Sequence, residues 1–170
     1  TGPFLWAPNS GGTTSSSTGP AGDNTSGTGF YLYTEASSPA AAGDSAILTL
    51  PEFDLTPLTV PEISYFYHMY GADIQRLDLQ VYDATSMTWT TIDSILGQQQ
   101  SGSADAWLEA RVDLSAYNTN TNLQLRFITV RGASFNGDVA LDDITVRETP
   151  ACVDPTNLMV TNATGNSVSL

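Results

Sequence analysis

The chain has 170 residues, of which 41% are hydrophobic and 14% charged, enough for one well-filled core and unlike a disordered chain. Five Lys and Arg against eighteen Asp and Glu give a net charge of −13, a field that repels phosphate backbones and anionic membranes. Nucleic acid is therefore excluded as an expected partner. Hard cations such as calcium suit the acidic surface because they prefer carboxylate and carbonyl oxygens, and a surface that serves only solubility is the alternative.

Neither a membrane span nor a disulfide framework is expected. No apolar stretch approaches the roughly 20 residues of a membrane helix, and the first residues lack the basic start and apolar core of a signal peptide. The chain is therefore interpreted as a mature or excised fragment of a larger protein. Its single cysteine, Cys152, excludes an internal disulfide, and it either pairs beyond the fragment or serves as a small apolar residue.

Short alternating segments follow a long polar stretch. Residues 9 to 29 have no apolar periodicity and many turn formers, which predicts a long surface loop. Strands are then predicted, in chain order, at Phe30–Glu35, Ser45–Leu50, Glu62–Tyr70, Leu77–Asp83, Thr88–Ile95, Leu108–Leu114, Leu123–Val130 and Val139–Val146. Because short strands recur at regular spacing and no helical period is sustained, the expected fold is all-β, an antiparallel jelly-roll β-sandwich.

The segment EISYFYHMY predicts a central strand. Alternation places Ile63, Tyr65, Tyr67 and Met69 on one face, and the other face also carries aromatic side chains. After Glu148 the pattern changes to a Pro-bounded linker and two short alternating stretches. The expected organisation is one domain over residues 1–148, followed over 149–170 by a linker and the first strands of an incomplete second module.

Three stretches together resemble the MAM domain family: GGTTSSSTGPAGDNTSGTGFYLYTEAS, ISYFYHMYG and DVALDDITV. The resemblance covers most of residues 6–148 and includes Trp89 and Trp107, which it implies are structural. The tail resembles the start of a fibronectin type III module at Pro155, Leu158 and the NSVSL run. The absence of paired cysteines is similar to bacterial members of the family.

The resemblance implies a jelly roll in the extracellular part of a secreted or cell-surface protein. It implies adhesion, oligomerisation or targeting, with other protein domains or cell-surface glycans as partners and no catalytic activity of the domain itself. The strand that normally precedes Trp6 in this family is missing, so Trp6 is expected to be partly exposed. A carbohydrate-binding module that targets an attached enzyme, and a structural spacer, are the alternatives.

Carboxylates near both ends of the predicted domain suggest a structural calcium ion. Asp142 and Asp143 are neighbours on a strand and should point to opposite faces, with Asp142 on the face of Ile144 and Val146. A buried carboxylate needs compensation, which a cation supplies. Similar jelly rolls often hold calcium between an early loop and the last strand. The candidate ligands are Asp23, Glu35, Asp44 and Asp142.

Hydrogen bonding is the alternative for these carboxylates, since Asp23 could cap a turn and Asp142 could accept backbone N–H groups. Aromatic side chains raise a second possibility, because exposed rings stack on sugars. The candidate platform is Tyr31, Tyr33, Tyr70 and Phe135, and the alternative is that these rings fill or cover the core.

Catalysis and zinc binding find no support in the residue pattern. His68 is the only histidine, lies between aromatic residues and has no nucleophile motif to serve. One His and one Cys make no zinc site. A glycosidase pair of carboxylates is not excluded by sequence, but the family resemblance argues against it. The expected function is a non-enzymatic, calcium-stabilised, extracellular binding module.

Overall fold

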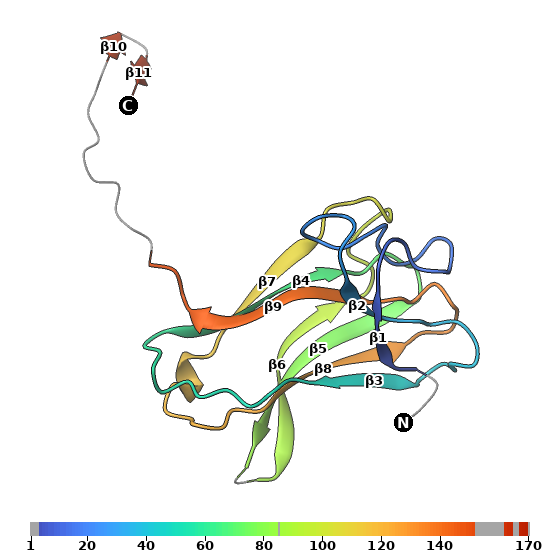
Figure 1. The fold of residues 1–170 in the computed structure, drawn as a ribbon, viewed down its shortest axis with the longest axis horizontal. Helices are drawn as coiled ribbons and strands as arrows, with labels where there is room; N and C mark the ends of the chain where they lie inside the picture. Colours follow the sequence, from blue (N-terminus) through green and yellow to red (C-terminus); the bar gives the residue numbers. More distant parts are fainter. Residues whose placement is uncertain (1–3, 85, 152–161, 165–166, 170) are drawn as a thin grey trace.

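The computed structural model describes residues 4–84, 86–151, 162–164 and 167–169, and its main body is a sandwich of two antiparallel sheets (Figure 1). The first sheet has the order β1 (Trp6–Asn9), β2 (Tyr31–Thr34), β9 (Ala140–Glu148), β4 (Pro61–His68), β7 (Leu108–Asp113). The second has the order β3 (Ser45–Thr49), β8 (Leu125–Arg131), β5 (Ile74–Asp83), β6 (Thr88–Leu96). The prediction of an all-β antiparallel sandwich is confirmed.

All eight predicted strands are present, with ends shifted by up to three residues. One strand, β1, was missed, because it has only four residues and contains Pro8, which is typical of an edge position. The only helix among the described residues is a three-residue 3-10 turn, η1 (Ser115–Tyr117). No helix in this part of the chain is long and apolar enough to span a membrane.

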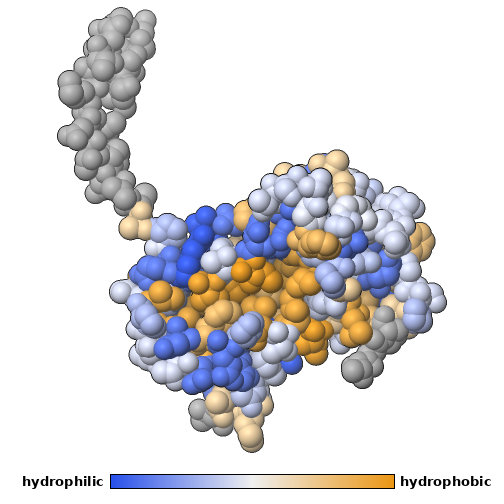
Figure 2. All heavy atoms as spheres, in the orientation of Figure 1, coloured by the Kyte–Doolittle hydropathy of each residue, from blue (hydrophilic) through white to orange (hydrophobic). Residues whose placement is uncertain are grey.

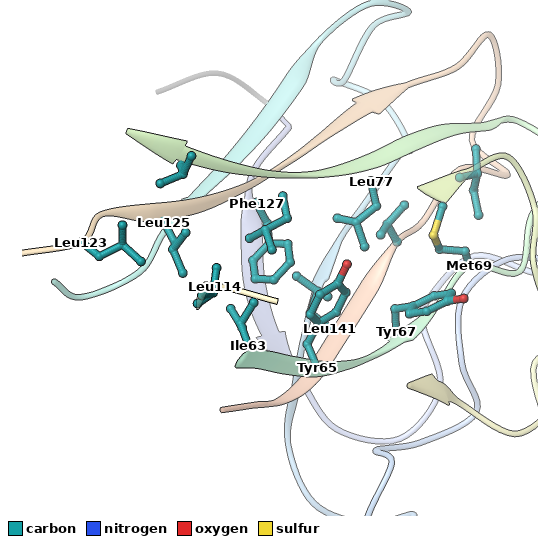
Figure 3. Packing of buried hydrophobic residues seen from close by; sticks show 14 of the residues in the cluster. Ile63, Tyr65, Tyr67, Met69, Leu77, Leu114, Leu123, Leu125, Phe127 and Leu141 are labelled. Atoms are coloured by element: carbon teal, nitrogen blue, oxygen red, sulfur yellow. The ribbon is translucent and has the colours of Figure 1, made fainter. Parts of the chain in front are cut away.

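The core lies between the sheets and is built around β4 (Figure 3). Ile63 and Tyr65 are fully buried on its inner face, and so is Met69 directly after the strand, as alternation predicts. Tyr65 meets Phe127 of β8 edge to face at 4.8 Å between ring centroids, and its hydroxyl donates to Asp93 of β6 at 2.7 Å. Aromatic burial of this kind dominates core energetics, and β4 lies inside its sheet as expected of a central strand.

A β-bulge in β9 overturns the predicted placement of Asp142. The pairing of β4 with β9 shifts register between Ser64 and Phe66, and Asp143 takes a positive φ of 48°. Asp142 therefore lies opposite Phe66 on the outer face, whereas Val146 lies opposite Ile63 on the inner face. The extra residue of the bulge breaks the alternation that the sequence analysis assumed.

The polar stretch after β1 is a loop held against the outer face of the first sheet. Gly19 donates its N–H to the Tyr70 carbonyl, and Ala21 donates to the Ser103 carbonyl, both at 2.8 Å. Trp107 Nε1 donates to the Gly22 carbonyl at 3.1 Å. We call residues 10–30 the covering loop. In Figure 1 it lies at the same end of the sandwich as the 97–107 connection.

Trp6, in edge strand β1, is half-buried, as expected. Its ring packs against the core and its Nε1 donates to the Ala46 carbonyl at 3.3 Å. At the other end of the chain, β10 (Asn162–Thr164) and β11 (Ser167–Ser169) pair antiparallel. Cys152, Pro155 and Leu158 lie outside the described residues, and the fibronectin type III-like module stays a prediction.

Candidate functional site

The first sequence-predicted carboxylates to come together are Asp23 and Asp142. The covering loop places Asn24 on the bulge, where its N–H donates to Asp142 Oδ2 at 2.9 Å and its side-chain amide donates to Asp143 at 2.9 Å. The side chains of Asp142 and Asp143 therefore both accept hydrogen bonds from Asn24 instead of pointing to opposite faces of the sheet. Burial raises the pKa of Asp142, and the charges of Asp143 and Asp23 add to this effect against two backbone hydrogen bonds.

Asp23 closes a turn of the covering loop. Its carboxylate accepts from the N–H of Gly29 at 2.6 Å and from the N–H of Ser26 at 3.0 Å, and also from the Ser26 hydroxyl. Desolvation raises the pKa of Asp23, but these hydrogen bonds outweigh it and the net shift is downward. All four carboxyl oxygens of Asp23 and Asp142 accept a hydrogen bond.

Glu35 and Asp44 lie apart from this pair. Glu35 accepts hydrogen bonds from the hydroxyls of Thr14 and Ser15 and from the N–H of Ser37, and these bonds outweigh desolvation to lower its pKa. Asp44 closes a turn by accepting from the N–H of Ala41 at 2.8 Å. Within the described ranges no three His, Cys, Asp or Glu side chains gather as metal ligands, so the four predicted ligands do not converge on one point.

Asp138, a residue that the sequence analysis missed, is the most deeply buried carboxylate near the covering loop. It is 0% exposed, its Oδ1 accepts from the N–H of Ala36 at 2.8 Å, and its Oδ2 has no partner among the described residues. Desolvation raises its pKa to about 7, and the charge of Glu35 contributes. The signal that could have revealed it is an Asp placed directly before a fully apolar stretch, in the motif GDVAL.

The four aromatic residues predicted as a sugar platform differ in how far they are exposed. Tyr31 is buried, edge to face with Trp107 at 5.6 Å, and its hydroxyl bridges Asn9 and the Gly11 carbonyl. Tyr33 and Tyr70 are half-buried. Phe135 alone of the four is exposed, at 46%. Tyr31 thus follows the alternative interpretation, in which these rings cover the core.

His68 is buried against Trp107, with 5.6 Å between ring centroids. Desolvation lowers its pKa to about 4, which keeps the ring neutral near pH 7. Neither ring nitrogen has a hydrogen-bond partner within the described part of the chain. A general base needs a nucleophile within hydrogen-bond reach, so this geometry is that of a core histidine.

An apolar hollow of about 250 Å³ lies where β2 meets β9. It is lined by Pro8, Phe30, Leu32 and Ile144, with Asp142 and Asp143 among its polar lining. Phe30 is 75% exposed. Aromatic and aliphatic anchors with a few polar groups are the usual composition of binding sites.

The edge of β9 next to this hollow is open. β2 pairs with β9 only at Leu141 and Ala140, so residues 142–148 have no strand neighbour on that side within the described chain. Ile144 and Val146 are only partly buried here. Figure 2 shows apolar side chains gathered on the side of the sandwich between β9 and β3. An unpaired strand edge beside apolar side chains is a template for a further strand.

The fold and site define a jelly-roll module whose surface offers an apolar hollow and an open strand edge. The chain belongs to the MAM domain family: the model described as "MAM domain, meprin/A5/mu" matches residues 2–152.

Curated relatives agree with this assignment. MAM domain-containing glycosylphosphatidylinositol anchor protein 2 of Homo sapiens is 34% identical over 139 residues, 77% of this chain and 14% of that protein. MAM domain-containing glycosylphosphatidylinositol anchor protein 1 of Rattus norvegicus is 34% identical over 156 residues, 89% of this chain and 16% of that protein. The chain therefore spans a small part of these relatives.

Among solved structures, the K1 cleaved adhesin domain of Lys-gingipain from Porphyromonas gingivalis W83 has a similar fold. Its TM-score is 0.56 at 15% identity, over 87% of this chain and 86% of that one. At this identity the likeness shows the fold alone.

Proposed function

We propose that this chain is an extracellular, non-catalytic module that associates with another protein through the Phe30 hollow and the open edge of β9. The observation that carries the proposal is the exposure of Phe30 at the mouth of an apolar hollow beside an unpaired strand. Membership of the MAM family and relatives named as glycosylphosphatidylinositol anchor proteins support the extracellular location. His68 is buried and has no hydrogen-bond partner among the residues that the structure describes, which supports a role without catalysis.

The partner that suits this surface is an extended protein segment. A strand can hydrogen-bond to the free edge of β9 while alternate side chains enter the hollow, which is the mode of β-strand addition. The carboxylates of Asp142 and Asp143 line the hollow, and the whole chain carries a charge of −13. We therefore expect a segment in which alternating apolar residues are flanked by Lys or Arg.

Selection from a phage-displayed library of short random peptides tests this role. Enriched peptides should alternate apolar and polar residues, carry Lys or Arg, and lose binding to a Phe30→Ser variant. Leu96→Ser is the matched control, because Leu96 is 67% exposed but lies in β6 of the other sheet. Peptides that bind both variants equally would place the interaction elsewhere.

A glycan array on the same proteins tests the two alternative roles, carbohydrate binding and structural spacing. The half-buried and buried tyrosines leave few open ring faces for sugar stacking, so we expect no glycan to bind. Glycan binding that survives Phe30→Ser would replace protein association with carbohydrate recognition. A domain that selects neither peptides nor glycans would be a spacer.

Calcium stabilisation is part of the proposal. Asp23 and Asp142 are oxygen donors of a type that calcium takes, and they lie close enough for their charges to interact. Each of their carboxyl oxygens, however, already accepts a hydrogen bond.

We expect chelator to lower the melting temperature, and an Asp142→Ala variant shows whether that residue is a ligand. If Asp142 is a calcium ligand, the Asp142→Ala variant should lose the response to chelator. If Asp142 is only a hydrogen-bond acceptor, the variant should keep that response. A melting temperature that chelator leaves unchanged would end the calcium proposal.

A further inference from the structure

The outer face of the second sheet presents a basic and an apolar group side by side. Within this sheet β8 lies between β3 and β5 (Figure 1). Alternation along β8 buries Phe127 in the core and turns Arg126 and Ile128 to the outer face. The register places Gln80 of β5 beside Arg126, and Ile47 of β3 beside Ile128. Ile47 is 48% exposed, and Arg126 and Ile128 are half-buried, so this face meets solvent.

Arg126 is held in one orientation by residues of β5 and β6. Its guanidinium carbon lies 4.1 Å from the ring centroid of Trp89, and Trp89 packs against Tyr82 with 5.2 Å between centroids. The Nε of Arg126 donates to Gln80 Oε1 at 2.9 Å, and Gln80 Nε2 donates to the Thr91 hydroxyl at 3.0 Å. Because stacking and the Nε bond both fix the guanidinium plane, the Nη1 and Nη2 donors are preorganised.

Arg126 differs from the other four arginines of the chain. Arg76, Arg111 and Arg147 each pair with a carboxylate, and the buried Arg131 donates to two backbone carbonyls. Arg126 forms no ion pair with any residue that the structure describes, and its only hydrogen bond there is the one from Nε. Desolvation lowers its pKa, and no nearby carboxylate offsets the effect. Its Nη1 and Nη2 donors are therefore available to an acceptor from outside this part of the chain.

The chemistry of this face favours a protein segment with a carboxylate. Two parallel N–H donors of a guanidinium match the two oxygens of a carboxylate. The apolar side chains of Ile47 and Ile128 next to the charge suit an aliphatic side chain better than the hydroxyl groups of a sugar. The backbone of β8 is already paired with β3 and β5, so recognition depends on side chains and not on strand addition.

The spacing along β8 defines the segment further. Arg126 and Ile128 are two residues apart on one strand, which is roughly 7 Å. An extended segment that lies along β8 has the same period, because its alternate side chains point to one side. An acidic residue over Arg126 therefore places the residue two positions away over Ile128.

We propose that the outer face of the second sheet is a second interaction surface, which binds an extended protein segment with Asp or Glu two positions from Leu, Ile or Val. The carboxylate accepts from Nη1 and Nη2 of Arg126, and the aliphatic side chain packs on Ile47 and Ile128. This surface goes beyond association through Phe30, because the hollow beside Phe30 belongs to the other sheet and favours basic segments. One module therefore joins two segments of opposite charge.

Peptide selection on the Phe30→Ser variant tests the proposal, because that variant lacks the first surface. A phage-displayed library of short random peptides should yield peptides with the acidic and aliphatic residues two positions apart. An enriched peptide is then synthesised, and its affinity for the unmodified protein is measured by calorimetry. Arg126→Gln should weaken binding by about 10- to 100-fold, as expected for charge-assisted hydrogen bonds.

A double-mutant cycle locates the contact. Replacing the acidic residue of the peptide by its amide should weaken binding to the unmodified protein as much as Arg126→Gln does, and should have no further effect on that variant. Arg111→Gln is the matched control, since it makes the same change of charge at an exposed arginine of the first sheet and should keep full affinity. A peptide whose acidic and aliphatic residues are adjacent should bind less tightly, because those side chains point to opposite sides.

Circular dichroism on each variant separates lost binding from lost folding. If Arg126→Gln does not fold, Ile47→Ser replaces it, because Ile47 is 48% exposed, and binding should weaken roughly 5-fold. Enriched peptides without an acidic residue, or equal affinity of Arg126→Gln and the unmodified protein, would overturn the proposal. Heparin that binds in place of acidic peptides and is lost in Arg126→Gln would also overturn it, in favour of a sulfated glycan. Loss of the basic peptides selected at Phe30 is a separate readout, so either surface can fail alone.

Discussion

The two faces of the first sheet are stabilised by different interactions. The inner face meets the second sheet through apolar side chains such as Tyr65 and Ile63. The outer face is covered at one end by a polar loop and buries His68, Thr18 and Asp138 there. His68 and Asp138 keep polar atoms without a hydrogen-bond partner among the described residues. The inner face therefore depends on packing, whereas the outer face depends on hydrogen bonds and on the protonation or ligation of buried groups.

The largest effect should come from truncating the inner face. Tyr65→Ala removes a fully buried ring and its contact with Phe127, so we expect a loss of about 3–5 kcal/mol in the free energy of unfolding. Denaturant unfolding measures it. Tyr65→Phe is the control, since it keeps the ring and loses only the hydrogen bond to Asp93, at about 1 kcal/mol. Equal losses in both variants would contradict a face held by packing.

The outer face should respond to acid through His68. Its pKa is about 4 in the folded protein and 6.5 when unperturbed. The stability that the neutral buried ring allows is fully present above pH 6.5 and is lost as the pH falls from 6.5 toward 4. The linked change is on the order of 3 kcal/mol. The difference in unfolding free energy between the protein and His68→Phe should show this slope. A difference that is flat over this range would mean that His68 is not buried as a neutral ring.

Contact between the covering loop and the sheet can be broken at Gly71. Its φ is +152°, and a Cβ there would lie 2.5 Å from the Asn136 carbonyl oxygen and 2.8 Å from the Thr18 hydroxyl. Gly71→Ala should cost about 2–3 kcal/mol, because strain and close contact add. Gly27→Ala is the control, with positive φ but nothing within 4 Å, and should cost about 1 kcal/mol. Thermal melting compares the two variants, and similar shifts would show that the close approach is relieved.

The smallest effect is expected from the loss of one of the hydrogen bonds that hold the covering loop. Trp107→Phe loses the bond from Nε1 to the Gly22 carbonyl and should lower the unfolding free energy by about 1 kcal/mol. Hydrogen exchange should quicken at residues 19–29 and stay unchanged in β5. Faster exchange in both places would mean that Trp107 supports the whole sandwich.

Sequence alternation predicted the inner face well because β4, β5 and β8 repeat apolar residues with a period of two. It failed at Asp142 because a bulge with positive φ at Asp143 shifts the alternation. Asp adopts positive φ more readily than most residues, so an Asp at this position does not reveal the bulge in the sequence. It missed Asp138, since burial there comes from a loop more than 100 residues away in the chain. Separation of the four predicted ligands likewise depends on contacts that no local pattern encodes.

The position of Trp107 also gives the protein an internal optical reporter. Its indole touches the only imidazole in the chain, one tyrosine ring and the carbonyl of a loop glycine. Its emission should therefore shift to longer wavelengths when the covering loop lifts and lets water reach the indole. In a variant whose Trp6 and Trp89 are replaced by Phe, loop detachment could then be followed by the emission of Trp107 and collapse of the sandwich by circular dichroism.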